Sequence, residues 1–239
     1  MNFLLTGKQK GRVEHKLPDL YLATEKIITR IISWTATITS KGGRMEQKDR
    51  DYILRLFPAL VKIKEGDIRE KVIQTWLNSW KRSNFLRIED VHQFEPARDY
   101  ISYTNVDHTN QVCQACERMA TIPAEILSLK LNPDYLLAGA LLHDVDKMVI
   151  FDAPTGGWTE AGRRTSHALE GASMARAEGL PDEVAHIIEA HSTKFSPHPP
   201  KSIEAQILRH ADILVANAVY MALGLEMEKV MNESLARLR

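Results

Sequence analysis

The chain has 239 residues, of which 44% are hydrophobic, enough to bury the core of one large domain or of a domain with an appendage. It carries 31 acidic and 31 basic residues, so no overall field attracts nucleic acid or an anionic membrane. The amino terminus has too short an apolar run for a signal peptide, and no later stretch is long enough to span a bilayer. We therefore expect a cytoplasmic protein that binds anions only locally.

The first part of the chain, residues 1–100, is expected to be a helical region of unknown role. Amphipathic patterns predict helices at residues 20–37, 47–63 and 67–82, with a turn at 40–43 after the first. Asp67 is the expected cap of the third helix. Trp76 and Trp80 lie on its apolar face, and packing in the core is favoured over stacking on a ligand.

Two cysteines, Cys113 and Cys116, follow in the run VCQACERMA. On a helix they lie one turn apart. The chain has no second cysteine pair that could complete a zinc ribbon. Ordinary helix packing is therefore favoured over a redox or metal-binding role.

A buried helix is predicted for residues 132–145, which read NPDYLLAGALLHDV. An Asn-Pro start precedes a run of apolar residues, and His143 and Asp144 fall at the carboxyl end. A carboxylate in such surroundings needs a partner, because burial of an unpaired charge is costly. A metal ion is one such partner.

Further histidines and an aspartate occur near the ends or in the apolar middle of the segments that follow. In residues 164–179, Ser166 is an expected cap and His167 lies in the first turn. In residues 180–192, Pro181 opens a helix that has His191 near its end. Residues 202–223 are predicted to form a long helix that holds Asp212 among apolar neighbours.

Histidine and aspartate side chains of this kind suit zinc, iron, manganese and similar divalent ions, and a carboxylate can bridge two of them. Six such groups suffice for two ions. The candidate metal ligands are His108, His143, Asp144, His167, His191 and Asp212.

On these residues the chain resembles the HD-domain superfamily of metal-dependent phosphohydrolases. Its members are all-helical and carry a histidine, a His-Asp pair and a distant aspartate as ligands. The matching runs are VDHTNQV with His108, LLHDVDK with His143 and Asp144, and RHADILVA with Asp212. The two histidines between the pair and the last aspartate fit the subset with two metals, in which Asp144 bridges both ions. The resemblance implies a catalytic domain at residues 101–239, an HD-domain helical bundle, with the N-terminal helical region added to it.

The sequence departs from many relatives after the pair, where they continue with glycine and lysine and this chain has Asp146 and Lys147. The resemblance implies that Lys147 faces the active site and holds a substrate anion or a transition-state charge. Asp146 either pairs with that lysine or points elsewhere. The Gly-Tyr-Pro signature is missing after His191, which argues against a cyclic-di-GMP phosphodiesterase.

Substrate contacts are expected from the segments around the ligands. A Gly-Gly loop directly follows the His-Asp helix, and such loops often cover a site. Arg163 and Arg164 after this loop, together with Lys194, are the candidate substrate-binding residues, and Trp158 is a further candidate contact.

These observations predict a metal-dependent hydrolase of a phosphate ester or anhydride, in a nucleotide or another small phosphorylated metabolite. Two divalent ions would activate a water, with Asp144 and Lys147 as catalytic residues. Manganese or iron is expected, with zinc, magnesium, nickel or cobalt as alternatives. The expected partner is a small anionic molecule rather than a membrane or a nucleic acid polymer, and a methionine-rich C-terminal helix allows a homodimer.

Three other functions stay open on the sequence. The same ligand set occurs in di-iron oxygenases of the myo-inositol oxygenase type. A metal-activated water also attacks carbonyl carbon, so hydrolysis of a carbonyl or ring bond is an alternative. The third is a regulatory module in which the metal only stabilises the fold.

Overall fold

The computed structural model describes residues 46–192 and 196–237, so the predicted helix at 20–37 and the turn at 40–43 lie outside the described residues. The described residues form α-helices and short 3-10 helices without a strand, which confirms the all-α fold. The α-helices are α2 (Gln47–Leu56), α3 (Gly66–Arg82), α4 (Asn105–Met119), α5 (Thr121–Leu127), α6 (Pro133–Leu142), α7 (Lys147–Ile150), α8 (Glu160–Arg164), α9 (His167–Ala177), α10 (Asp182–Glu189), α11 (Ile203–Ala222) and α12 (Met227–Ala236). The 3-10 helices are η1 (Pro58–Lys62), η2 (Ile88–Asp90) and η3 (Glu95–Ala97).

Helix α6 lies at the centre of the fold and is buried along almost its whole length. It begins where predicted, because the Asn132 side chain accepts hydrogen bonds from the first turn and Pro133 occupies the first position. Helices α3, α4, α10 and α11 pack around it. Gly139 permits the close approach of α10, since a β-carbon there would overlap the side chain of Ile187.

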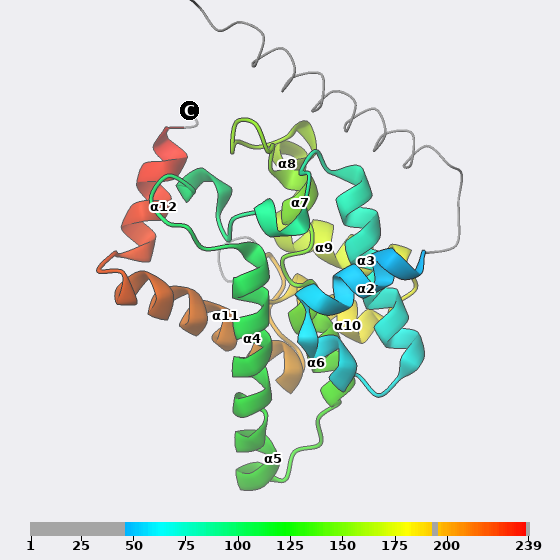
Figure 1. The fold of residues 1–239 in the computed structure, drawn as a ribbon. Coiled ribbons are helices and arrows are strands. Elements are labelled where there is room, and N and C mark those ends of the chain that lie inside the picture. The colour runs from blue at the N-terminus through cyan, green and yellow to red at the C-terminus, as the bar shows by residue number, and fades with distance from the viewer. Residues whose placement is uncertain (1–45, 193–195, 238–239) are drawn as a thin grey trace, which may run out of the picture. The chain divides into compact units, whose positions relative to one another are not determined.

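The long helices α4 and α11 cross beside α6, and α12 follows α11 (Figure 1). Helix α11 confirms the prediction for residues 202–223, and Ser202 caps it through the N–H of Ala205. Helix α12 packs against η3, and the Arg237 guanidinium lies 4.6 Å from the centre of the Tyr100 ring. The C-terminal helix is thus fixed to the segment that precedes α4. None of the described helices has the length and apolar character that crossing a membrane requires.

Two predicted helices before residue 100 begin or end differently in the structure. The helix predicted for residues 47–63 is broken, because Pro58 has no N–H to continue α2 and starts η1 instead. The next helix begins at Gly66 with Glu65 at its N-cap. Asp67 therefore lies in the first turn, where it pairs with Lys71 at 2.6 Å instead of capping the helix.

Helix α3 joins the same core as the helices that follow residue 100. Trp76 is fully buried and stacks on Phe57 with ring centres 4.5 Å apart, so its predicted place in the core is confirmed. Helix α3 also packs against α6, α7 and α9. The residues described belong to one compact unit, and the division into functional parts at residue 100 stays a prediction.

Candidate metal centre

The predicted His-Asp helix ends at Leu142, three residues earlier than expected, and the chain then turns through residues 143–146. Carbonyl groups at the end of α6 and in this turn accept hydrogen bonds from side chains of other helices. The donors are Trp76 Nε1 to Leu141 (3.0 Å), Asn105 Nδ2 to Asp144 (3.1 Å) and Ser79 Oγ to Val145 (2.7 Å). All three donor groups lie on buried faces of α3 and α4, which fix the direction of the His-Asp pair.

Four histidines converge from four different helices or their ends, and each is oriented through its Nδ1 atom. The Nδ1 partners are Tyr103 Oη for His108 (3.2 Å), the Ala140 carbonyl for His143 (2.8 Å), Asp146 Oδ2 for His167 (2.7 Å) and the Ile188 carbonyl for His191 (2.6 Å). Each Nε2 atom is therefore turned toward the carboxylate of Asp144. Histidines that bind metals are commonly held in this way by their second nitrogen.

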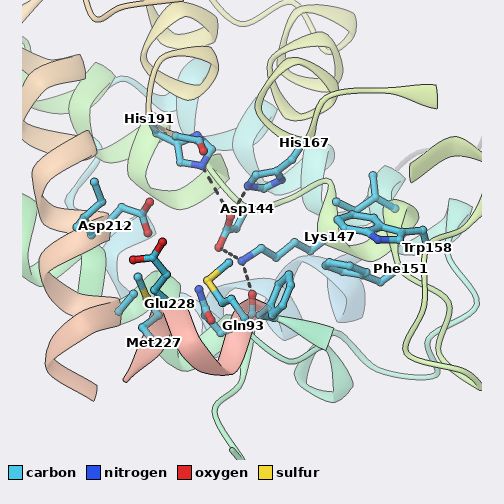
Figure 2. A pocket seen from close by; sticks show the side chains of 16 residues that line it. Gln93, Asp144, Lys147, Phe151, Trp158, His167, His191, Asp212, Met227 and Glu228 are labelled. Carbon is cyan, nitrogen blue, oxygen red and sulfur yellow. Dashed lines mark hydrogen bonds and ion pairs between the residues drawn. The ribbon is translucent and has the colours of Figure 1, made fainter. Parts of the chain in front are cut away.

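Asp144 lies between two pairs of histidines, and each of its oxygens faces one pair. Figure 2 shows one of these pairs, His167 and His191, beside the Asp144 carboxylate. Oδ2 is 3.3 Å from His143 Nε2 and 3.6 Å from His108 Nε2. Oδ1 is 3.0 Å from His167 Nε2 and 3.9 Å from His191 Nε2. A carboxylate placed like this can serve two ions at once.

Asp212 completes the set from the middle of α11. Its Oδ1 atom is 2.9 Å from His108 Nε2 and 4.0 Å from His143 Nε2. The structure thus brings all six candidate ligands together. The first set has His108 and His143, with Asp212 beside them, and the second has His167 and His191, while Asp144 is common to both.

The chemistry of the cluster suits divalent metal ions. His143 Nε2 is buried and has no hydrogen-bond partner among the described residues. A buried polar atom without a partner is costly, and a metal ion supplies one. Imidazole nitrogens and carboxylate oxygens are the ligands that zinc, iron and manganese share, so the residues fit a metal without selecting one.

The charge states of four of the six ligands agree with this interpretation, whereas burial lowers the pKa of His143 but Asp144 and Asp212 raise it above its usual value. Burial lowers the pKa of His108 and, together with His167 and His143, lowers that of His191 to about 3, so both imidazoles are neutral. Burial opposes ionisation of Asp144 and Asp212. However, Lys147 and His143 hold the pKa of Asp144 well below its usual range, and the hydrogen bond from His108 lowers that of Asp212 to about 2. Neutral imidazoles and ionised carboxylates are the forms that bind metals.

His167 has a different environment, because it lies between two carboxylates. Burial opposes its protonation, but Asp146 and Asp144 raise its pKa to about 10. A divalent ion bound at its Nε2 takes the place of that proton. The Asp146 contact had no signal in the sequence, where the residue stood out only because many relatives have glycine there.

Lys147 follows the turn and points into the same centre (Figure 2). Its ammonium is 2.5 Å from Asp144 Oδ2 and also donates to the carbonyl of Gln93. An ammonium has three donors, so one N–H remains for a further acceptor. The lysine therefore bonds to Asp144, whereas Asp146 bonds to His167.

A cavity of about 240 Å³ opens onto this centre. Its lining combines the metal-site residues with an apolar wall that includes Phe94, Phe151, Trp158, Met227 and Met231. Trp158, a candidate contact from the Gly-Gly loop, thus lies at the cavity.

The two arginines predicted to bind substrate do not line this cavity. Arg163 and Arg164 are exposed on α8, and neither lines the cavity. Arg164 pairs with Glu160 at 2.5 Å. Lys194 lies outside the described residues. Substrate binding by these three residues stays a prediction.

The fold and site define an all-helical protein with a histidine and aspartate cluster suited to divalent metals, and comparison with known proteins agrees. The HD-domain family profile matches residues 105–217. Dihydroneopterin 2′,3′-cyclic phosphate phosphodiesterase of Methanocaldococcus jannaschii is 30% identical over 168 residues, which cover 66% of this chain and 66% of that enzyme. The chain belongs to the HD-domain superfamily, which confirms the predicted resemblance.

Two relatives named as ribonucleases also match. Ribonuclease Y of Acidothermus cellulolyticus is 35% identical over 86 residues, 36% of this chain and 15% of that enzyme. The 3′-5′ exoribonuclease YhaM of Geobacillus sp. is 24% identical over 236 residues, 92% of this chain and 66% of that enzyme. The chain thus spans about two thirds or less of the length of these relatives. No solved structure shows a significant match.

Proposed function

We propose that this protein is a metal-dependent phosphohydrolase that cleaves a phosphate ester of a small molecule. The placement of Asp144 carries the proposal, because its two oxygens face two separate pairs of histidines about 3 to 4 Å away. Such a carboxylate suits a pair of ions that share one ligand. The names of the relatives, a cyclic phosphate phosphodiesterase and ribonucleases, support a reaction at phosphorus.

Divalent ions held by the six ligands would supply a water of lowered pKa and would neutralise charge on the phosphoryl oxygens. Lys147 contributes from the side of Asp144 Oδ2, where its remaining N–H can donate to a phosphoryl oxygen. Its bonds to Asp144 and to the Gln93 carbonyl hold the ammonium in place before substrate arrives. A fixed positive charge at the reacting phosphate stabilises the charge that grows in the transition state.

The apolar wall of the cavity acts on the other half of the substrate. Phe94, Phe151 and Trp158 offer aromatic surface beside the metal centre, which suits the organic group of an ester. A substrate that fills this space also displaces water from the site. The cavity of about 240 Å³ suits a small molecule. Whether the protein also cleaves RNA is tested by the RNA oligonucleotide in the substrate panel.

The test is turnover of a panel of phosphomonoesters, cyclic and linear phosphodiesters and a single-stranded RNA oligonucleotide. The protein is purified without oxygen and supplied with manganese or iron. Asp144→Ala removes the shared ligand, and Glu233→Gln, on the exposed side of α12 and outside the cavity lining, is the matched control. We expect a phosphate ester to be hydrolysed by the parent protein and the control, and at least about 100-fold more slowly by Asp144→Ala.

Other outcomes would contradict specific parts of the proposal. Cleavage of the RNA with no small ester turned over would overturn the small-molecule substrate. No hydrolysis by protein that binds two ions would overturn the phosphohydrolase, and oxygen consumption by the iron form would then favour the oxygenase. Equal rates for Asp144→Ala and Glu233→Gln would remove Asp144 from the reaction.

A further inference from the structure

Part of the cavity wall comes from residues outside the segment that matches the HD family. Gln93 and Phe94 precede that segment, and Met227, Glu228 and Met231 on α12 follow it. The cavity wall is therefore built partly by residues outside the HD segment, whereas the six candidate ligands all lie inside it.

The aromatic side chains of this wall form a continuous surface. Phe151 lies 4.7 Å from Trp158, ring centre to ring centre, and 6.1 Å from Phe94, which meets it edge-on. Phe94 and Phe151 are buried, so their positions are fixed by packing. Rigid aromatic surface favours a flat ring as its ligand, because stacked or edge-on rings attract each other beyond the area that they bury.

Glu228 is the polar exception in this wall. It lies in the first turn of α12, it is exposed to the cavity, and none of the described residues forms an ion pair or hydrogen bond with it. Figure 2 shows its carboxylate on the same side of the cavity as Asp212. A carboxylate in the cavity wall repels a phosphate, so the role of Glu228 is not to bind the phosphate group of a substrate.

The chemistry of a carboxylate restricts what Glu228 can bind. It only accepts hydrogen bonds, and its two oxygens can accept from two neighbouring N–H groups in parallel. A planar heterocycle with two adjacent N–H donors on one edge satisfies both oxygens. The same ring can lie on the aromatic wall while the phosphate reaches the metal centre.

We propose that Glu228 is a specificity-determining residue that selects phosphate esters of a planar heterocycle with adjacent N–H donors, such as the edge of guanine. This inference rests on the proposed phosphohydrolase function. Met227 and Met231 on either side of Glu228 suit the faces and edges of such a ring, since their flexible side chains adapt to its shape.

Guanosine and inosine 2′,3′-cyclic phosphates test the proposal, because inosine lacks only the amino group next to the ring N–H. We expect the parent protein to prefer the guanosine ester by about tenfold in kcat/KM, because the Glu228 carboxylate forms one hydrogen bond fewer with inosine. Glu228→Gln should reduce the preference to within about twofold, whereas Glu233→Gln should retain it. Equal rates for the two esters in the parent protein, or an unchanged preference in Glu228→Gln, would overturn the proposal.

Binding separates this inference from the proposed reaction. The 3′-monophosphates of guanosine and inosine are titrated calorimetrically into the manganese-loaded protein and its two variants. A preference for guanosine that Glu228→Gln abolishes would support the role of Glu228 even if no ester is cleaved, in which case only the phosphohydrolase fails. Ester cleavage without any preference in rate or binding would leave the phosphohydrolase and overturn the role of Glu228.

Discussion

Replacing Asp146 by alanine should weaken metal binding by the set that contains His167 and leave binding by the other set almost unchanged. Asp146 is fully buried, and its Oδ2 atom is 2.7 Å from His167 Nδ1. A carboxylate bonded to the second nitrogen of a histidine orients the ring and makes it a stronger ligand. His167 belongs to the set with His191, whereas the other set has no contact of this kind to Asp146.

The size of the effect follows from this geometry. Loss of an outer partner of a metal-binding histidine commonly reduces metal affinity by about 10 to 100-fold, or about 1.4 to 2.7 kcal/mol. We expect the upper part of this range for Asp146→Ala, because the bond is short, charged and buried. Asp146→Asn keeps an oxygen acceptor of the same shape without the charge, so its loss should be smaller.

The assay is calorimetric titration of metal-free protein with manganese, which resolves a first and a second binding event. Asp146→Ala should weaken only one event, and Asp212→Ala, at the opposite set, should weaken only the other. Thermal unfolding of Asp146→Asn checks that the fold is kept. Unchanged affinity at both events in Asp146→Ala, or an equal loss at both, would refute the argument.

Three further predictions concern stability and reactivity. Ser79→Ala should lower the free energy of unfolding by about 2 kcal/mol, because the buried carbonyl of Val145 loses its hydrogen bond. If the free energy of unfolding falls by about 2 to 3 kcal/mol per M of urea, the urea midpoint falls by about 0.7 to 1 M. Ser234→Ala, which removes a hydroxyl bonded within its own helix, should change the midpoint little, and equal shifts in both variants would contradict this reasoning. Cys113 and Cys116 are buried, which raises their pKa, so iodoacetamide should label them only after unfolding; rapid labelling of the folded protein would disprove this. Removal of metal by a chelator should lower the melting temperature, and manganese should restore it, since an ion at 100 times its Kd stabilises the folded state by about 2.7 kcal/mol. An unchanged melting temperature in both experiments would show that no bound metal stabilises the fold.

The sequence could predict the cluster of candidate ligands because each residue lies at a position that a helical pattern can reveal. His143 and Asp144 end an apolar run with a clear start, and Asp212 is a charge inside another apolar run. Such residues stand out against their local surroundings. The structure brings them together, as the ordered series of histidines and aspartates predicted.

The contacts that fix the direction of the His-Asp pair could not be predicted, because each joins segments that lie far apart in the chain. The bond from Ser79 to Val145 spans 66 residues, and neither residue differs from an ordinary helix or turn residue in the sequence. The position of Glu228 at the cavity could not be predicted either, because in the sequence it is one of several acidic residues on an amphipathic helix. The predicted helix at 132–145 was also too long, since its last turn is replaced by bonds that only the folded chain provides.

The way in which the histidines are held has a consequence for how the protein acquires its metals. All four rings are held by a hydrogen bond at Nδ1 in the folded chain, so an arriving ion meets a preorganised set of nitrogens and little entropy is lost on binding. Folding and metal loading are then one linked equilibrium. A substitution that loosens a helix far from the cluster should appear first as a lower metal content and only later as unfolding.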